Sequence, residues 1–295
     1  MPTNPQTHFI IRVGHYTLLT LLALLSIGPF LWLLITALKS GDENIFNAAQ
    51  FLPEKPTFEN FVETWNTVHI GTYMLNSIIV ATLTVSLNLI FSTLAAYPLA
   101  RMQFQGRQAV FLSILSTMMI PFQVIMIPLY LMMLKMGLTG NSGIGLASFF
   151  SNELPVHVWI GLIIPFAISG FGIFFVRQAL IGLPKELEES AVLDGCNSFD
   201  VLVRVLVPLI YPTLATLAVF TFMASWGEFL WPSIILSEEP HFTLPVGLVY
   251  LQGAFSANWR MIAAGTVLSM LPIIVFFVIL QRFFVSGNIS SAVKG

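Results

Sequence analysis

The chain has 295 residues, of which 56% are hydrophobic and only 9% are charged. Soluble globular proteins carry roughly 25% charged residues. This composition therefore excludes a soluble enzyme and a disordered chain, and the long apolar runs favour an α-helical membrane protein over a membrane barrel, whose strands alternate. The net charge of −2 gives no basic field for nucleic acid, and the single cysteine, Cys196, excludes an internal disulfide and a cysteine-based metal site.

Six stretches of the chain are apolar and long enough to cross a bilayer, since a span needs about 20 mostly apolar residues. In chain order they cover residues 16–38, 73–100, 109–134, 158–180, 209–236 and 261–280. Two tails, residues 1–15 and 281–295, flank the spans. We therefore predict an all-α, polytopic membrane bundle of six transmembrane helices that forms a single domain over residues 1–295.

Lysine and arginine are unevenly distributed between the two sides of this bundle. Eight of the twelve lie on the side of the two tails, and four lie on the other side. Because the side richer in Lys and Arg is normally cytoplasmic, we predict that both termini are cytoplasmic. Residues 39–72, 135–157 and 237–260 then face the outside.

Polar residues inside the spans are candidates for a solute pathway, because ionisable groups in a bilayer are costly and often functional. Glu228 is the only carboxylate deep in a predicted span, and helical spacing places it on one face with Thr221 and Ser225. Aromatic residues occupy a neighbouring face, namely Phe222, Trp226 and Phe229. Hydroxyls beside aromatic rings suit a sugar, which offers both hydroxyl groups and an apolar face. The alternative is that Glu228 caps a broken helix or bonds a neighbouring subunit, and that the aromatic residues belong to the core.

The candidate pathway residues are Asn76, Gln123, Ser225, Trp226, Glu228 and Trp231. Further polar residues share a face of the second span, namely Ser77, Thr84, Asn88 and Ser92, and residues of this kind more often pack helices together than line a pathway. No Lys or Arg lies deep in any predicted span. Because a phosphorylated or carboxylate solute would need a cationic partner, this favours a neutral solute.

The cytoplasmic segment of residues 181–208 has the pattern of two short helices around a turn. Acidic residues after Pro184 favour the start of a helix, and Asp194-Gly195 is a turn signal. Asn197 or Ser198 can cap the next helix, which carries an apolar stripe of Phe199, Leu202, Val203 and Leu206. This segment either packs on its own bundle or fits a groove on a cytosolic partner.

Two motifs resemble those of a known family. Glu189-Ser190-Ala191-x-x-Asp194-Gly195, followed by Phe199 and Pro208, resembles the EAA signature of ABC importer permeases. The run from Ser225 to Pro232 resembles the Trp-Asn-Glu-Phe-Leu-Trp-Pro run of the carbohydrate-uptake subfamily, with Gly227 in the position of the Asn. The likeness extends over nearly the whole chain and is greatest to the second, maltose-type permease subunit.

The resemblance implies a permease subunit of the bacterial plasma (inner) membrane that translocates a sugar-like solute by alternating access and is not itself an enzyme. It implies contact with an ATPase subunit through Glu189, Ser190, Ala191, Asp194 and Gly195, and through the C-terminal tail, residues 292–295. The chain has no P-loop of the form G-x-x-x-x-G-K-[ST], so no cofactor or metal is expected on it and ATP-Mg is expected on a partner. The implied partners are a second homologous permease, two copies of a cytosolic ATP-binding subunit, an extracytoplasmic solute-binding protein and membrane lipid.

Three rival functions remain open from the sequence. The importer could carry another solute, such as glycerol phosphate or an osmolyte. The chain could be a proton-coupled secondary transporter that uses Glu228. A membrane-embedded enzyme would need a catalytic cluster, and none is apparent in the sequence.

Overall fold

The computed structural model describes residues 5–45, 47, 50–67, 69–140, 156–254 and 258–287. These residues form helices and connecting loops, with no strand among them. Contacts group the chain into two compact units. The first comprises residues 1–70 and 248–271, and the second comprises residues 71–247 and 272–295.

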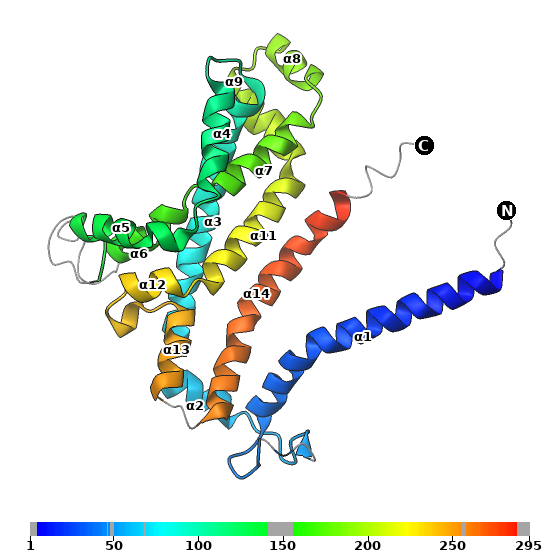
Figure 1. The fold of residues 1–295 in the computed structure, drawn as a ribbon, viewed down its shortest axis with the longest axis vertical. Helices are drawn as coiled ribbons and strands as arrows, with labels where there is room; N and C mark the ends of the chain where they lie inside the picture. The colour runs from blue at the N-terminus through cyan, green and yellow to red at the C-terminus, as the bar shows by residue number, and fades with distance from the viewer. Residues whose placement is uncertain are drawn as a thin grey trace. The chain divides into compact units, whose positions relative to one another are not determined.

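Among the described residues, three helices contain an unbroken apolar stretch long enough to cross a bilayer. They are α1 (Pro5–Leu38), α3 (Ile70–Arg101) and α14 (Trp259–Gly287), with stretches of 27, 32 and 24 residues (Figure 1). The expected N-terminal tail of residues 1–15 is therefore largely helical, because α1 already begins at Pro5. The expected contact of residues 292–295 with an ATPase lies outside the described residues.

The remaining predicted spans are broken helices. α4 (Arg107–Thr117) and α5 (Phe122–Lys135) meet at 95°, and α6 (Val156–Ile163), extended by η3 (Ile164–Phe166), meets α7 (Gly170–Ile181) at 54°. Residues 198–209 meet α11 (Tyr211–Gly227) at 79°. If each bent pair is one span, the total is six, as the sequence predicted.

The predicted span of residues 209–236 is not one helix. It is divided into α11 and α12 (Leu230–Ile235), with Glu228 between them in an extended conformation (φ −70°, ψ 119°). Proline lies at two of the breaks, because it lacks a backbone N–H and its ring clashes with a preceding helical turn, so it starts a helix more readily than it continues one. Pro121 precedes α5, and Pro212 lies in the first turn of α11.

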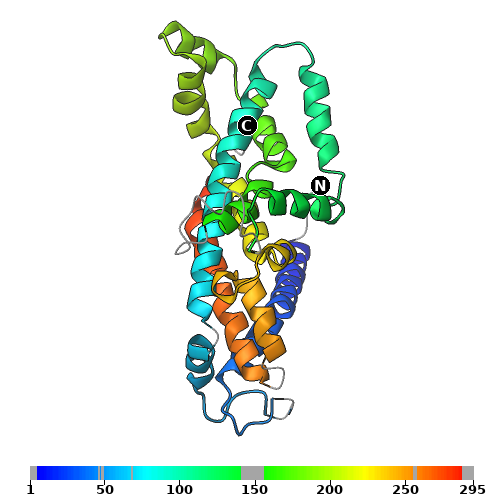
Figure 2. The same ribbon diagram turned by 90° about the vertical axis from the view of Figure 1, so that its left-hand side faces the viewer.

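Two buried apolar clusters lie in the described part of the second unit. One joins α3 and α7 to the segment that follows α7, which contains α8 (Glu186–Leu193), α9 (Ser198–Asp200), η4 (Val201–Leu206) and α10 (Val207–Leu209). The other surrounds Trp231 of α12 and includes Val158 and Leu162 of α6. Figures 1 and 2 show α8 and α9 at the same end of the unit as the C-terminal end of α3.

The first unit packs the end of α1 against α2 (Glu59–Thr67) and the start of α14. Ala37, Ala263 and Ala264 form its small buried cluster. The Asn60 side chain donates hydrogen bonds of 2.8 Å to the carbonyls of Ala37 and Lys39, which fixes α2 to the end of α1. η5 (Glu239–His241) and α13 (Leu244–Ala254) connect α12 to α14 along the chain.

Candidate functional site

A cavity of about 390 Å³ lies in the second unit among α3, the α6–α7 break, α11 and α12. Ligand sites typically enclose about 300–1,000 Å³, so the cavity has the size of a small-molecule site. Its polar lining consists of Ser77, Thr84, Asn88, Ser169, Thr221, Ser225, Glu228 and Thr243. Its aromatic lining consists of Phe166, Phe171, Phe220 and Trp231, and none of the described residues that line it is a lysine or an arginine.

Hydrogen bonds between α3 and the α6–α7 break shape one wall of the cavity. Asn88 donates from Nδ2 to the Phe166 carbonyl and to Ser169 Oγ, at 3.1 Å each. Ser169 Oγ also accepts from the Gly172 amide at 3.0 Å, so it caps α7. The break between α6 and α7 is therefore held open by polar contacts, because the side chains of Asn88 and Ser169 replace the interrupted helical bonds.

Two hydroxyl groups on the cavity wall are buried without a hydrogen-bond partner in the described part of the chain. They are Thr84 Oγ1 and Thr243 Oγ1, on residues that are 1% and 4% exposed. A buried hydroxyl without a partner costs about 1–3 kcal/mol. Thr84 and Thr243 therefore border the cavity with hydroxyl groups that are not bonded within the described chain.

Glu228 has two roles at the break between α11 and α12. Its Oε1 accepts a hydrogen bond of 3.1 Å from the Trp231 amide, so it caps the first turn of α12. The same half-buried residue lines the cavity. The capping alternative that the sequence left open is therefore present together with the cavity position.

Trp231 is fully buried and forms part of the cavity wall. Its indole Nε1 donates to the Gly161 carbonyl at 3.2 Å, and its ring stands edge-on to Phe122 at a centroid distance of 5.7 Å and an interplanar angle of 83°. These contacts hold the indole in one orientation against the cavity. Ser225, another predicted pathway residue, also lines the cavity.

The other predicted pathway residues lie elsewhere. Trp226 is buried and stacks on Phe222 at 5.6 Å, and Phe222 stacks on Phe276 of α14 at 4.0 Å, so this aromatic face packs helices together. Asn76 donates to the carbonyls of Pro240 and Phe242, at 2.9 and 3.1 Å. Gln123 is exposed on α5.

Sequence reasoning did not select Thr84, Asn88 or Thr243 as pathway residues. The polar face of the second span was the available signal for Thr84 and Asn88, but residues of this kind more often pack helices together. Thr243 lies in the loop between η5 and α13, and nothing in its local sequence pointed to the cavity.

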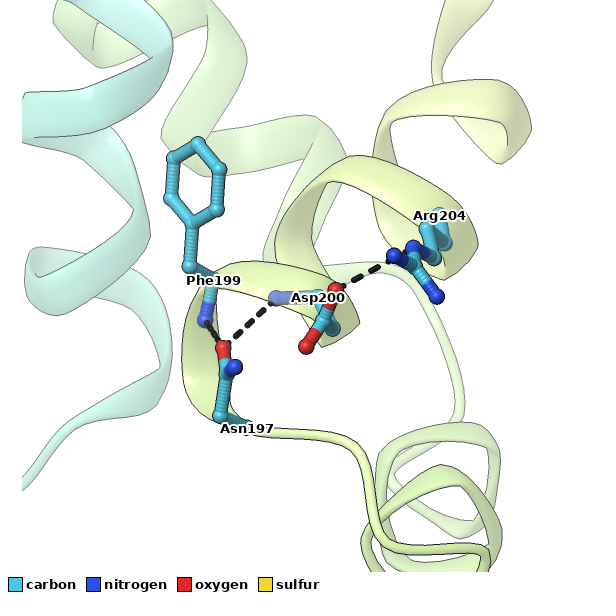
Figure 3. A network of polar contacts seen from close by, with 4 residues as sticks. All are labelled: Asn197, Phe199, Asp200 and Arg204. Carbon is cyan, nitrogen blue, oxygen red and sulfur yellow. Dashed lines mark hydrogen bonds and ion pairs between the residues drawn. The ribbon is translucent and has the colours of Figure 1, made fainter.

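The segment after α7 has the two-helix form that the sequence predicted. Gly195, at φ +88°, makes the turn after α8, and glycine adopts this conformation readily. The Asn197 side chain then caps α9 by accepting from the amides of Phe199 and Asp200, at 2.9 and 3.0 Å (Figure 3). The predicted apolar stripe is only half buried, because the π-helical turn η4 shifts residues around the axis and leaves Phe199 and Val203 exposed.

Four of the five predicted coupling residues are exposed on this segment: Glu189, Ser190, Asp194 and Gly195. Ala191 instead belongs to the buried cluster that joins α8 to α3 and α7. Leu193, beside them, is 87% exposed. The segment therefore presents an exposed, partly acidic surface that also carries large apolar side chains, among them Val192, Leu193 and Phe199, whereas Ala191 is used for internal packing.

Comparisons with known proteins agree with this architecture. The family model described as "Binding-protein-dependent transport system inner membrane component" matches residues 88–288. The chain is 31% identical over 296 residues to the arabinooligosaccharides transport system permease protein AraQ of Halalkalibacterium halodurans, covering 99% of each chain. It is 32% identical over 267 residues to the melibiose/raffinose/stachyose import permease protein MelC of Bacillus subtilis, covering 90% of this chain and 91% of that protein.

Solved structures show the same similarity. The chain resembles a chain of a bacterial ABC transporter involved in the import of the acidic polysaccharide alginate, with 25% identity and a TM-score of 0.77. That match covers 96% of this chain and all of the other.

Proposed function

The chain belongs to the family of inner-membrane components of binding-protein-dependent transport systems, and from this membership we propose that it is the permease subunit of an importer for a neutral, carbohydrate-like solute. The relatives support a carbohydrate, because their names specify arabinooligosaccharides and melibiose, raffinose and stachyose. Transport then proceeds by alternating access, with no covalent chemistry on this chain.

The cavity is the observation that carries the choice of solute. A sugar presents several hydroxyl groups and an apolar face of C–H groups, and the cavity offers hydroxyls, an amide, one carboxylate and aromatic rings. Thr84 and Thr243 supply hydroxyls that have no partner within the described chain. A neutral oligosaccharide or polyol fits this set of groups.

The rival solutes fit the cavity less well. Glycerol phosphate and acidic oligosaccharides are anions, and an anion inside the membrane needs a cationic partner. The only charged residue among those described on the cavity wall is Glu228, which would repel them. An uncharged osmolyte stays compatible with the wall, and a direct comparison of probes separates it from a sugar.

The exposed surface of α8 and its turn is the proposed contact with the ATPase. Glu189, Ser190, Asp194 and Gly195 are free to reach a partner, and the predicted orientation places them on the cytoplasmic side. Because the chain has no P-loop, ATP-Mg binds to two copies of a separate subunit. A second homologous permease and an extracytoplasmic solute-binding protein complete the proposed assembly.

The test is purification of the tagged chain from its native membrane, followed by mass spectrometry and ATPase assays in nanodiscs. The probes are arabinotriose, raffinose, glycerol, glycerol 3-phosphate and an alginate oligosaccharide. We expect an ATPase subunit and a second permease to co-purify, and a neutral sugar to stimulate hydrolysis in the presence of the binding protein. Stimulation only by an anionic probe would refute the neutral solute.

A matched pair of variants tests the ATPase contact. Glu189→Gln removes a carboxylate from the proposed surface, and Glu63→Gln removes an exposed one from α2, outside this segment. We expect stimulated hydrolysis to fall in the first and to persist in the second. If the chain instead purifies alone and accumulates solute on a proton gradient without ATP, the secondary-transporter alternative is correct.

A further inference from the structure

A buried ion pair fixes α8 to the end of α3. Arg101, the last residue of α3, places its Nε 2.7 Å from Glu188 Oε1 in the first turn of α8. The two side chains are only 6% and 18% exposed. The same guanidinium donates from Nη2 to the Leu183 carbonyl at 2.8 Å, so one cation holds both α8 and the chain that leads into it.

The ion pair lies on a different face of α8 from the proposed ATPase contact. Glu188 and Ala191 are three residues apart, so they share the face that packs on the membrane helices. Glu189 and Leu193 are four residues apart and share an exposed face. One short helix therefore has an outward face for a partner and an inward face bonded to α3.

α3 connects this contact to the cavity. It is one continuous helix of 32 residues from Ile70 to Arg101. Thr84 and Asn88, on its middle turns, line the cavity, and Arg101, at the C-terminal end of the helix, forms the ion pair. A displacement of α8 that α3 follows would therefore move two groups of the cavity wall.

A second arginine reinforces the same end of α3. Arg177 of α7 donates from Nε to the Leu99 carbonyl at 3.0 Å, and its guanidinium lies 3.8 Å from the centre of the Phe111 ring of α4. The ends of α3, α4 and α7 are thus tied together, while Arg101 adds α8 to them. Without Arg101, Ala191 is the buried residue through which α8 itself joins the cluster formed with α3 and α7.

We propose that Arg101 and Glu188 are positioning residues that make α8 and α3 move as one body, so that ATPase motion reaches the cavity. Because a buried charge that loses its partner is strongly unfavourable, separation of α8 from α3 is resisted in every direction. Apolar contacts alone are not directional and permit sliding. The proposal rests on the proposed importer function, in which α8 contacts an ATPase.

The test uses the whole importer in proteoliposomes, with the neutral sugar probe that stimulates the wild type. Sugar imported and ATP hydrolysed are measured together, and their ratio is the readout. In Arg101→Gln and Glu188→Gln we expect the complex to assemble and to hydrolyse ATP, while sugar imported per ATP falls about tenfold, within the usual range of coupling between sites. The swapped pair Arg101→Glu with Glu188→Arg should recover most of that loss.

Arg204→Gln is the matched control. Arg204 pairs with Asp200 at 3.1 Å in the same cytoplasmic segment, but this pair lies within one stretch of helix, and the Arg204 side chain is 74% exposed (Figure 3). Exposed pairs of this kind contribute little, so its ratio should match the wild type.

A ratio within twofold of the wild type in assembled Arg101→Gln would overturn the proposal. If a single variant does not assemble, the swapped pair is measured in its place. A swapped pair that assembles but does not recover the ratio of sugar imported to ATP hydrolysed would show that the ion pair has only a structural role, and this too would overturn the proposal. A wild-type complex that shows no sugar-stimulated hydrolysis would contradict the proposed function itself, which separates the two failures.

Discussion

Gly161→Ala tests how closely α6 packs beside the cavity. A Cβ on Gly161 would lie well inside van der Waals contact of the Leu138 carbonyl oxygen and 3.2 Å from its carbonyl carbon. The obstacle is backbone, and the Leu138 amide is itself bonded to the Met133 carbonyl at 2.9 Å. Leu138 therefore cannot yield as a side chain would, so α6 has to move away from it.

The expected cost combines three contributions. Overpacking of a tight site costs about 1–3 kcal/mol. A shift of α6 also stretches the bond from Trp231 Nε1 to the Gly161 carbonyl, and a buried donor left without a partner costs about 1–3 kcal/mol. Replacing Gly by Ala inside a helix returns up to about 1 kcal/mol. We expect a net destabilisation of about 3 kcal/mol, together with reduced uptake because Trp231 lines the cavity.

Unfolding of the purified chain in one detergent, followed by tryptophan fluorescence, measures this cost. Gly28→Ala is the control, because it lies inside α1 with no heavy atom within 4 Å of its added Cβ. The control should be neutral or slightly stabilising. A Gly161→Ala variant as stable as this control would refute the close approach of α6 to Leu138.

Three further outcomes follow from the structure. Gly172→Ala should cost about 1–3 kcal/mol in the same unfolding assay, since its Cβ would meet the Ser92 hydroxyl and also Asn88 Oδ1 and Ser169 Oγ, whose side chains are held by the hydrogen bonds of the α6–α7 break. Glu228→Gln keeps an acceptor for the Trp231 amide and should retain most sugar uptake. In Glu228→Ala, sugar uptake should fall about tenfold while membrane insertion stays normal. A proton-coupled transporter would instead lose uptake in both variants. Desolvation raises the pKa of the Glu43 carboxyl. Hydrogen bonds from three backbone amides and a hydroxyl together lower this pKa by more than desolvation raises it, so the net pKa lies below its usual value. Glu43 then stabilises its loop above the unfolded pKa, and the protection factors of the amides over residues 50–57, corrected for the intrinsic exchange rate, should fall as the pH falls through the lowered folded value.

The sequence predicted the long spans because only length and composition decide them. α1, α3 and α14 were recognisable as apolar stretches without any knowledge of their neighbours. The breaks were less predictable, since proline alone does not determine them. Pro98 and Pro272 lie inside continuous helices, whereas Pro121 adopts an extended conformation before α5 (φ −60°, ψ 136°).

The cavity was only partly predictable from helical periodicity. The spacing of Thr221, Ser225 and Glu228 correctly placed them together, because all three line the cavity. The same reasoning placed both Ser225 and Trp226 among the pathway residues. Ser225 lines the cavity, whereas Trp226 packs on Phe222 instead. Whether a residue lines a cavity or fills a contact depends on which helices surround it, and Thr243 reaches the wall from a different part of the chain.

α3 gives a physical reason why polar residues persist along an otherwise apolar span. Asn76 binds carbonyls around η5, Asn88 binds the α6–α7 break, and Arg101 binds α8, so each tethers a different part of the second unit. Thr84 lies between these anchors with its hydroxyl on the cavity wall. Because the bonds of Asn76 and Asn88 hold α3 on either side of it, the backbone at Thr84 moves with α3 as a whole. If α8 contacts an ATPase as proposed, contact of a solute with Thr84 should depend on the state of α8, and the polar face of α3 would then link solute and ATPase as well as pack helices.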